Sequence, residues 1–387
     1  MPRIGAPPPR FGDARLGRHT SVPDFPIVEV PIAPPPLTPP PTPIPAPIPP
    51  ATRKDIPRPA RHALGPVGEI VESYCLHYNG GEFRRLCRAF ATLLSDGGQI
   101  FLAMAGAFST AECGKILAPL IRRGAVGGIS CTGANLEEDV FRLVGHSRYI
   151  DLPGYQQLTR ADDMALAESH NPRVTDSTIP EKYAMAKTEG PVDKLWKRAH
   201  AAGQRIFPHE PLYELLNTGA FVDAYEKDPA ESWLYAAAQK HFPIVVPGWG
   251  DSTLGQVFMA SVYTGEYPDS LIKGDIAYGA EILLPWIVTT MRDQKVPVGF
   301  LQLGGGIAGD YSICGVPCLK ADAKVDVPFW AAFGQITDAE ETCGGYSGAK
   351  PSEKETWLKI DDGTPAAAVF GDYTTLLPFL VAYLLGW

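Results

Sequence analysis

The chain has 387 residues, of which 45 % are hydrophobic and 20 % are charged, which describes a globular protein with a sizeable core in one large or two ordinary domains. Its formal net charge of −9 argues against a general nucleic-acid-binding protein, which would present a basic surface. The longest apolar run, residues 374–387, is too short to span a bilayer and contains a proline, so we predict a closing helix and no membrane association.

The cysteines and histidines argue against disulfides and a metal centre. Seven cysteines occur without C-x-x-C spacing, and the eight histidines form no H-x-x-x-H or H-x-x-E-H pattern. An odd number of scattered cysteines is typical of reduced, mostly buried thiols. We therefore predict a cytoplasmic protein with no signal peptide and no bound metal.

The first 60 residues differ in composition from the rest. They hold 20 of the 39 prolines, and "PIAPPPLTPPPTPIPAPIPP" at 31–50 favours polyproline II rather than a packed core. We predict a disordered arm over 1–60 and one domain over 61–387. A bare tail is the preferred interpretation of the arm. A ligand for a proline-recognising domain and a cover over a neighbouring subunit are the alternatives.

The pattern after the arm alternates strands with helices. Apolar spacing predicts a helix over 83–97, a buried strand over 98–106 and an amphipathic helix over 110–126. The succession strand, loop and helix then recurs over 127–144, 242–260 and 297–312. Such alternation predicts an α/β fold with a parallel sheet that helices cover on both faces.

Small and polar residues follow four of the predicted strands. They lie at 105–110, 131–139, 248–255 and 303–310. Ligands of parallel sheets bind beyond the carboxyl ends of the strands, where glycine permits close backbone approach and helix N-termini offer N–H groups to phosphate. One such loop is more often a plain turn. Four together predict a dinucleotide or another phosphorylated cofactor.

The stretch "EKETWLKIDD" at 353–362 reads as the beginning of another strand. Strand alternation would place Trp357 and Lys359 on one face and Leu358 on the other. Lys359 is then either a solvated lysine at a strand edge or an amine nucleophile in a partly dry pocket.

Five motifs resemble one enzyme family. They are "FLAMAGAFSTAECG", "ISCTGANLEEDVF", "VPGWGDSTLGQVF", "LGGGIAGDYSICGVP" and "YSGAKPSEKETWLK", in this order over residues 66–387. The chain resembles the deoxyhypusine synthase and homospermidine synthase family, most closely its bacterial deoxyhypusine synthase-like branch. The resemblance implies a Rossmann-like fold, bound NAD, a polyamine substrate and a homotetramer with active sites at subunit interfaces.

The resemblance also implies a covalent mechanism. In this family, NAD takes a hydride from a polyamine such as spermidine, a lysine attacks the resulting imine, and an acceptor amine then displaces the lysine. Lys359 matches the family lysine, and Trp357 matches its tryptophan neighbour. The attack requires a neutral amine, which desolvation beside an indole would favour and carboxylates would oppose. Leu358 stands where the family usually has glycine.

The remaining family positions fall into two groups. The residues that match cofactor contacts are Gly106, Ala107, Phe108, Ser109, Thr110, Thr132, Gly133, Ala134, Asp251, Gly305, Asp338 and Asp372. Those that match polyamine contacts are Glu137, Glu138 and Glu353, where carboxylates would pair with ammonium groups. For Glu137 and Glu138, a charge that complements a helix N-terminus is the alternative interpretation.

Three positions depart from the family pattern. Asp310 replaces a histidine that assists proton transfer, Gln256 replaces an acidic residue, and Tyr346 replaces a second one. The departures predict a donor or acceptor other than spermidine bound as in the eukaryotic enzymes; putrescine, agmatine and a carboxylated polyamine are candidates. A transferase that makes a homospermidine-like polyamine is the first hypothesis. Modification of a protein lysine to deoxyhypusine is the second, and an oligomer that binds NAD or polyamine without turnover is the third.

Overall fold

The computed structural model describes residues 62–387, and the predicted proline-rich arm, 1–60, lies outside them. Six strands form the main sheet: β1 (Gln99–Met104), β2 (Val126–Cys131), β5 (Ile244–Val245), β6 (Val298–Leu303), β7 (Ala332–Thr337) and β8 (Ala366–Phe370). All neighbouring strands are parallel, as predicted. A separate two-stranded antiparallel hairpin pairs β3 (Arg173–Val174) with β4 (Ser177–Thr178).

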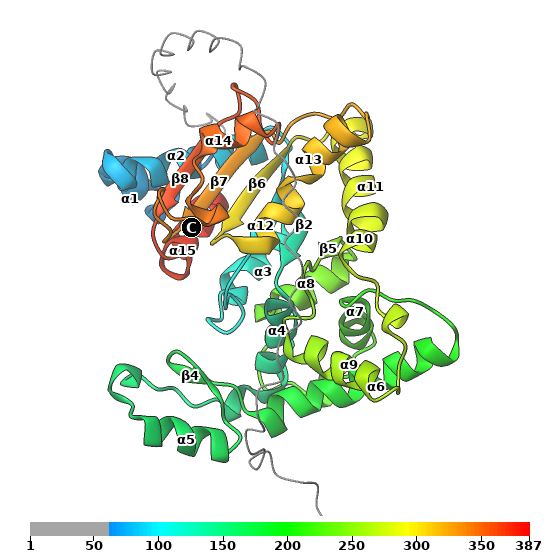
Figure 1. The fold of residues 1–387 in the computed structure, drawn as a ribbon. Coiled ribbons are helices and arrows are strands. Elements are labelled where there is room, and N and C mark those ends of the chain that lie inside the picture. Colours follow the sequence, from blue (N-terminus) through cyan, green and yellow to red (C-terminus); the bar gives the residue numbers. More distant parts are fainter. Residues whose placement is uncertain (1–61) are drawn as a thin grey trace, which may run out of the picture. The chain divides into compact units, whose positions relative to one another are not determined.

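The sheet has the order β5-β2-β1-β6-β7-β8 (Figure 1). The chain therefore runs outward from β1 to one edge through β2 and β5, and then returns to β6 to build the other half. β1 and β6 pair in register from Gln99–Val298 to Met104–Leu303. This is the strand order of dinucleotide-binding doubly wound folds, in which ligands bind at the reversal point beyond the carboxyl ends of the two central strands.

Fifteen α-helical segments occur in the described residues. Their bounds are α1 Pro66–Tyr74, α2 Tyr78–Ser95, α3 Gly114–Arg122, α4 Gly133–Gly145, α5 Arg160–Glu168, α6 Ala186–Ala201, α7 Glu210–Asn217, α8 Trp233–Lys240, α9 Thr253–Tyr263, α10 Asp275–Ala277, α11 Leu284–Ile287, α12 Gly306–Ile313, α13 Gly315–Pro317, α14 Pro351–Thr356 and α15 Tyr373–Leu385. Single turns of other helix types lie at His146–Arg148, Tyr155–Gln157, Glu181–Met185, Val222–Ala224, Pro229–Glu231, Asp269–Leu271, Tyr278–Leu283, Val288–Asp293, Cys318–Asp322 and Tyr346–Gly348.

Helices cover both faces of the sheet, as predicted, and strand β6 shows why. Gly299 faces α2 so closely that an added Cβ would lie 2.6 Å from Leu93 Cδ2. Gln302 points to the opposite face, where a Cβ on Gly309 of α12 would lie 2.6 Å from its Oε1 atom. Alternation along one buried strand therefore brings α2 and α12 onto opposite sides of it (Figure 1).

Most predicted elements are confirmed. The predicted helix 83–97 corresponds to α2, the strand 98–106 to β1, and the closing helix to α15. The three repeated segments correspond to β2–α4, β5–α9 and β6–α12. The helix predicted from residue 110 begins only at Gly114, because Glu112 has φ +55° and interrupts the helical path.

The prediction of a strand in 353–362 is wrong. Residues Pro351–Thr356 form helix α14 instead, with proline at its first position, where a missing N–H costs nothing. The chain then turns at Leu358, whose φ is +55°, so strand alternation does not apply to its neighbours.

All seven cysteines are free. Three of them are buried, three are partly buried, and Cys343 is exposed. In the part of the chain that the structure describes, no helix combines the length and the apolar composition that a bilayer crossing requires. Within the same residues, no three His, Cys, Asp or Glu side chains gather in a way that would hold a metal ion.

Candidate active site

Lys359 is buried, although it lies in a segment rich in charge. Only 7 % of the residue is exposed, whereas Trp357 is 66 % exposed and Leu358 45 %. The left-handed conformation of Leu358 separates the two environments, because it reverses the chain after α14 and turns Lys359 inward. Trp357 and Lys359 therefore do not share one face, and the indole is not the group that dehydrates the amine.

Two side chains contact the Lys359 amine. Asp310 of α12 places Oδ1 2.9 Å from Lys359 Nζ, and the Tyr346 ring centre lies 4.9 Å from the same nitrogen. The Cys314 thiol lies one helical turn beyond Asp310, with Sγ 3.6 Å from the shared Oδ1 atom. Asp310 is half exposed, so the pair opens to solvent on the carboxylate side. The structure thus joins Lys359, Asp310 and Tyr346, three residues that sequence reasoning selected separately.

A second buried lysine lies beside this group and was missed by the sequence analysis. Lys354 is 2 % exposed, and its Nζ lies 4.6 Å from the Tyr346 ring centre and 5.0 Å from that of Phe333 in β7. Burial, followed by the charge of Lys359, lowers the pKa of Lys354 to about 8. Burial also raises the pKa of Tyr346, which keeps the phenol neutral between the two amines.

An acidic pair, Glu137 and Glu138, forms a second group of perturbed residues, on α4. Glu137 is 1 % exposed and accepts backbone N–H bonds from Thr253 (2.6 Å) and Leu254 (2.8 Å) at the start of α9. Burial raises the pKa of Glu137 to about 7, and its N–H donors only partly oppose this. These contacts match the helix-terminus interpretation of Glu137.

Glu138 differs from Glu137 because, in the described part of the chain, no backbone N–H donates to it. Its carboxylate accepts a hydrogen bond from the Thr110 hydroxyl, in the loop that follows β1. Burial and then the neighbouring Glu137 raise the pKa of Glu138 to about 8. A carboxyl group that is mostly neutral near pH 7 and lies beside a strand-end loop is suited to pair with an incoming cation.

The loop after β1 forms one side of the reversal point. Gly106 has φ +66°, and the Tyr373 hydroxyl donates to Ala105 O (3.0 Å) directly before it. Ser109 is fully engaged within the protein, because its hydroxyl donates to Asn135 O (2.6 Å) and accepts from Trp233 Nε1 (2.9 Å). Phe108 and Thr110 are also buried, so Gly106 and Ala107 are the loop positions open to a ligand.

The loop after β6 forms the other side. Gly304 has φ +73°, and the next residue, Gly305, packs so tightly that an added Cβ would lie 1.6 Å from Ser347 Oγ. Neither position admits a side chain without strain or a clash. Glycine backbones therefore line both central strand ends, as close contact with a dinucleotide requires.

The other predicted residues occupy varied positions. Thr132 caps α4 by accepting from Asn135 N, Gly133 is buried against Ser252, and Ala134 is half-buried. Asp372 caps α15 by accepting from Thr374 N (2.8 Å). The remaining predicted residues are exposed: Asp251, Gln256, Asp338 and Glu353. Among residues 62–387, no hydrogen bond or ion pair joins Glu138 or Glu353 to the Lys359 amine.

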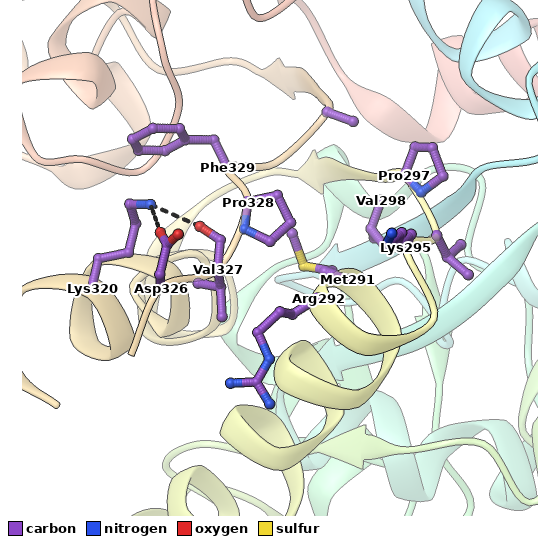
Figure 2. Close-up of a pocket in the computed structure, with 12 residues that line it drawn as sticks. Met291, Arg292, Lys295, Pro297, Val298, Lys320, Asp326, Val327, Pro328 and Phe329 are labelled. Carbon is purple, nitrogen blue, oxygen red and sulfur yellow. Dashed lines mark hydrogen bonds and ion pairs between the residues drawn. The ribbon is translucent and has the colours of Figure 1, made fainter. Parts of the chain in front are cut away.

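A cavity of about 580 Å³ lies elsewhere, at the amino-terminal ends of β6 and β7 (Figure 2). Lys320 closes one side by donating to Asp326 (3.1 Å) and to Val327 O (2.7 Å). It contains none of the predicted site residues, and it lies at the end of the sheet opposite the glycine loops. The perturbed residues, rather than this cavity, mark the candidate active site.

Comparisons with known proteins identify the family of the chain. The deoxyhypusine synthase family model matches residues 69–384. The deoxyhypusine synthase-like protein of Cyanothece sp. is 28 % identical over 324 residues, which cover 82 % of this chain and 79 % of that protein. The corresponding protein of Nostoc punctiforme is 28 % identical over 346 residues, which cover 86 % and 83 %. Enzymes of the family transfer an aminobutyl group and depend on NAD. The chain belongs to the deoxyhypusine synthase family.

Proposed function

We propose that this protein is an NAD-dependent aminoalkyl transferase of the homospermidine synthase type, in which Lys359 carries the aminoalkyl group as an imine. The observation that supports the proposal most directly is the burial of Lys359 with its amine 2.9 Å from Asp310 and against Tyr346. A lysine with only a structural role on a surface turn would extend into solvent, like Lys350 in the same segment.

The residues at the reversal point fit a dinucleotide. Gly106 and Gly304 supply left-handed backbone at the ends of the two central strands, and Gly305 brings the chain close to Ser347. Bound NAD would accept a hydride from the donor amine and return it to the final product. Gly106, Ala107 and Gly305 would hold it through backbone groups. Asp338 and Asp372, exposed residues that follow the carboxyl ends of β7 and β8, are proposed ribose contacts.

Lys359 would then act on the oxidised donor. Its neutral amine adds to the imine carbon, the carbon–nitrogen bond to the departing amine breaks, and a new imine joins the donor carbon chain to Nζ. An acceptor amine repeats the exchange and frees Lys359. Asp310, as the hydrogen-bonded neighbour of Nζ, is placed to hold the proton that the ammonium form gives up.

The acidic groups would bind the donor. Glu138 is the best candidate, because a cation beside it favours loss of the proton that burial holds there. Glu353 and Gln256 are exposed and would contact the distal part of an amine chain. Tyr346 replaces a carboxylate at a position that faces Lys359, so the site has less negative charge for a triamine. This difference favours a shorter or less charged donor than spermidine.

Glu138 and Lys359 are proposed to meet across subunits of a homotetramer. Two observations support assembly. Within residues 62–387, no hydrogen bond or ion pair joins the two residues. Large apolar side chains are also exposed on several helices, namely Tyr74, Tyr78, Met259, Tyr263, Ile276 and Ile307. Light scattering of the purified protein tests the assembly, and a stable monomer would contradict it.

The decisive experiment is product analysis with a trapping step. The protein is incubated with NAD and, in turn, spermidine, putrescine, agmatine or a carboxylated polyamine, and products are identified by mass spectrometry. Borohydride added during turnover should leave a secondary amine on Lys359. Lys359→Arg keeps the charge without the nucleophile and should reduce transfer by at least about 10³-fold, while the matched control Lys350→Arg should be fully active.

Three outcomes separate the hypotheses. A free polyamine product supports the proposal. Transfer to a protein lysine, with none to small amines, would favour the deoxyhypusine alternative. Binding of NAD without any transfer to any amine or protein acceptor would mean that the chain is a binding protein that has lost turnover.

A further inference from the structure

Lys354 and Lys359 form a pair of buried amines around one aromatic ring. The exposed fractions are 2 % and 7 %, and their Nζ atoms lie 4.6 Å and 4.9 Å from the centre of the Tyr346 ring. Backbone geometry links the two residues, because Lys359 N donates to Lys354 O (3.1 Å) across the turn at Leu358. The turn therefore fixes the positions of the two backbones relative to one another.

The two amines have unequal partners. Lys359 pairs with the Asp310 carboxylate. Within the described residues, Lys354 donates only to Ala349 O (3.1 Å) and otherwise faces the rings of Phe333 and Tyr346. Among residues 62–387, no carboxylate oxygen lies within 4.0 Å of Lys354 Nζ. A buried ammonium without an anionic partner loses much of its hydration, and a neighbouring positive charge adds to that loss.

The remaining charged and titratable groups around the pair are few. Glu353, exposed on α14, and Asp310 on α12 both favour a proton on Lys354, but less strongly than burial and Lys359 oppose it. Cys314 on α12 and Tyr346 have raised pKa values and stay uncharged near neutral pH. Lys354 therefore keeps its positive charge mainly below the value of about 8 at which it releases its proton.

We propose that Lys354 is a positioning residue for the nucleophile: its buried positive charge opposes a proton on Lys359 and so increases the fraction of Lys359 present as the free amine. The charge acts against Asp310, which favours the ammonium form of Lys359. An adjacent cationic group is a known way to activate a lysine. The importance of this for catalysis rests on the proposed function, whereas the coupling between the two amines does not.

The direction of the pH dependence follows from the charge on Lys354. Below about pH 8 Lys354 is an ammonium and its influence on Lys359 is present. Above that pH Lys354 loses its proton and its influence fades. Removal of the Lys354 charge should therefore reduce the reactivity of Lys359 at pH 6–7.5 and have little effect above pH 9. A change in packing would instead alter access to Lys359 by a similar factor at every pH.

Chemical labelling of the free protein tests the coupling without any substrate. The folded protein is treated with cyanate between pH 6 and pH 9.5, and the rate at which Lys359 is carbamylated is read by mass spectrometry of its peptide. Lys354→Met removes the charge and keeps the length, and Lys354→Gln removes it and keeps a donor for Ala349 O. Lys354→Arg keeps the charge, and Lys350→Met removes an exposed charge from the same segment as a control.

The expected rate of Lys359 carbamylation depends on the pH and on the charge at position 354. At pH 7 Lys359 should react about three- to tenfold more slowly in Lys354→Met and Lys354→Gln than in the wild type, as for two unit charges beside one ring in a partly buried site. The rates should converge above pH 9, and Lys354→Arg and Lys350→Met should match the wild type. Circular dichroism shows whether each variant is folded. Two neutral variants are used so that the test remains possible if one of them does not fold.

Equal rates at pH 7 in the wild type and in a folded neutral variant would overturn the inference, and so would a reduction of the same size at every pH. These results are independent of turnover. If no amine is transferred by the wild type but the labelling rates separate as described, the coupling stands and the proposed function fails. If the wild type transfers an amine but the labelling rates do not separate, the proposed function stands and the coupling fails.

Discussion

The acidic pair on α4 and the basic pair around Tyr346 each place two groups of like charge close together. Glu137 and Glu138 are adjacent carboxyl groups whose pKa values burial raises to about 7 and 8. Lys354 and Lys359 are two amines near one ring, and burial lowers the pKa of Lys354 to about 8. In both pairs, like charges are buried together, so at least one member changes charge near neutral pH.

The pairs differ in how each member is anchored. Glu137 is held by two N–H groups of α9, and Lys354 by a carbonyl and two rings, so each of these residues is fixed within the protein. Glu138 and Lys359 are instead held by side chains: Glu138 accepts a hydrogen bond from the Thr110 hydroxyl, and Lys359 pairs with the Asp310 carboxylate. In each pair, therefore, a residue that is anchored within the protein lies beside a reactive residue and influences the charge of that residue.

The largest effect on stability is expected when the hydrogen bonds that anchor the acidic pair are removed. Glu137→Ala leaves two N–H groups at the start of α9 without an acceptor in a buried site, so unfolding should become easier by about 3 kcal/mol. Denaturant titration measures the change. Glu138→Ala should cost less than about 1 kcal/mol, because its hydroxyl donor can turn to another acceptor. Equal losses in the two variants would remove the distinction between anchor and reactive residue.

The next effect concerns donor binding. Glu138→Gln keeps the shape but cannot become a carboxylate, so KM for the amine donor should rise about 10- to 30-fold, which corresponds to about 2 kcal/mol. Steady-state kinetics, with the donor that the product analysis identifies, measures this change in KM. Gln256→Ala, at an exposed position, should change KM by less than about threefold. An unchanged KM in Glu138→Gln would exclude Glu138 from the donor site.

Proton release should accompany donor binding. Glu138 is mostly protonated at pH 7, and an ammonium beside it favours the carboxylate, so about one proton should leave per donor bound. Donor affinity should therefore rise from pH 6 to about pH 8 and then level off. Calorimetry in two buffers of different ionisation enthalpy counts the protons. Glu138→Gln should show none, and release that persists in that variant would assign the proton to another group.

The smallest effect concerns the turn that positions the basic pair. Leu358 holds φ +55°, a conformation that costs a leucine about 1 kcal/mol and glycine very little. Leu358→Gly also makes the unfolded chain more flexible, so the net gain in stability should be only about 0.5 kcal/mol. Glu355→Gly, inside α14, should destabilise by about 0.5–1 kcal/mol. Thermal melts compare the two, and a loss of stability in Leu358→Gly would show that its side chain packs favourably.

Buried apolar runs account for the success of the fold prediction. Strands such as β1 and β6 are apolar except for one glutamine each, and glycine-rich loops follow them, so the sequence predicted the parallel sheet and its ligand edge. The error at 353–362 arose because alternating Trp357, Leu358, Lys359 and Ile360 resembles a strand. The proline at the first position of α14 and the acidic residue that follows were the helix signals.

The site could be predicted only in part, because its contacts are long-range. Asp310 and Lys359 are 49 positions apart, so their ion pair follows from the packing of α12 and not from any spacing. Lys354 was missed because two glutamates flank it and suggest an exposed helix. One turn of helix nevertheless places it on the same side as buried Pro351, while Glu353 and Glu355 face solvent.

The exposure of Trp357 has a practical consequence. The chain has seven tryptophans, and Trp357 is the most exposed of them, whereas Trp196, Trp233 and Trp330 are almost fully buried. An indole in water emits at longer wavelength than a buried one, so Trp357 contributes the red edge of the fluorescence spectrum. Because it lies two residues from Lys359, any ligand or second subunit that covers this turn should shift that edge to shorter wavelength. The fluorescence of Trp357 thus reports when a ligand or a second subunit covers the turn beside Lys359. The variant Trp357→Phe, which lacks this indole, is the control.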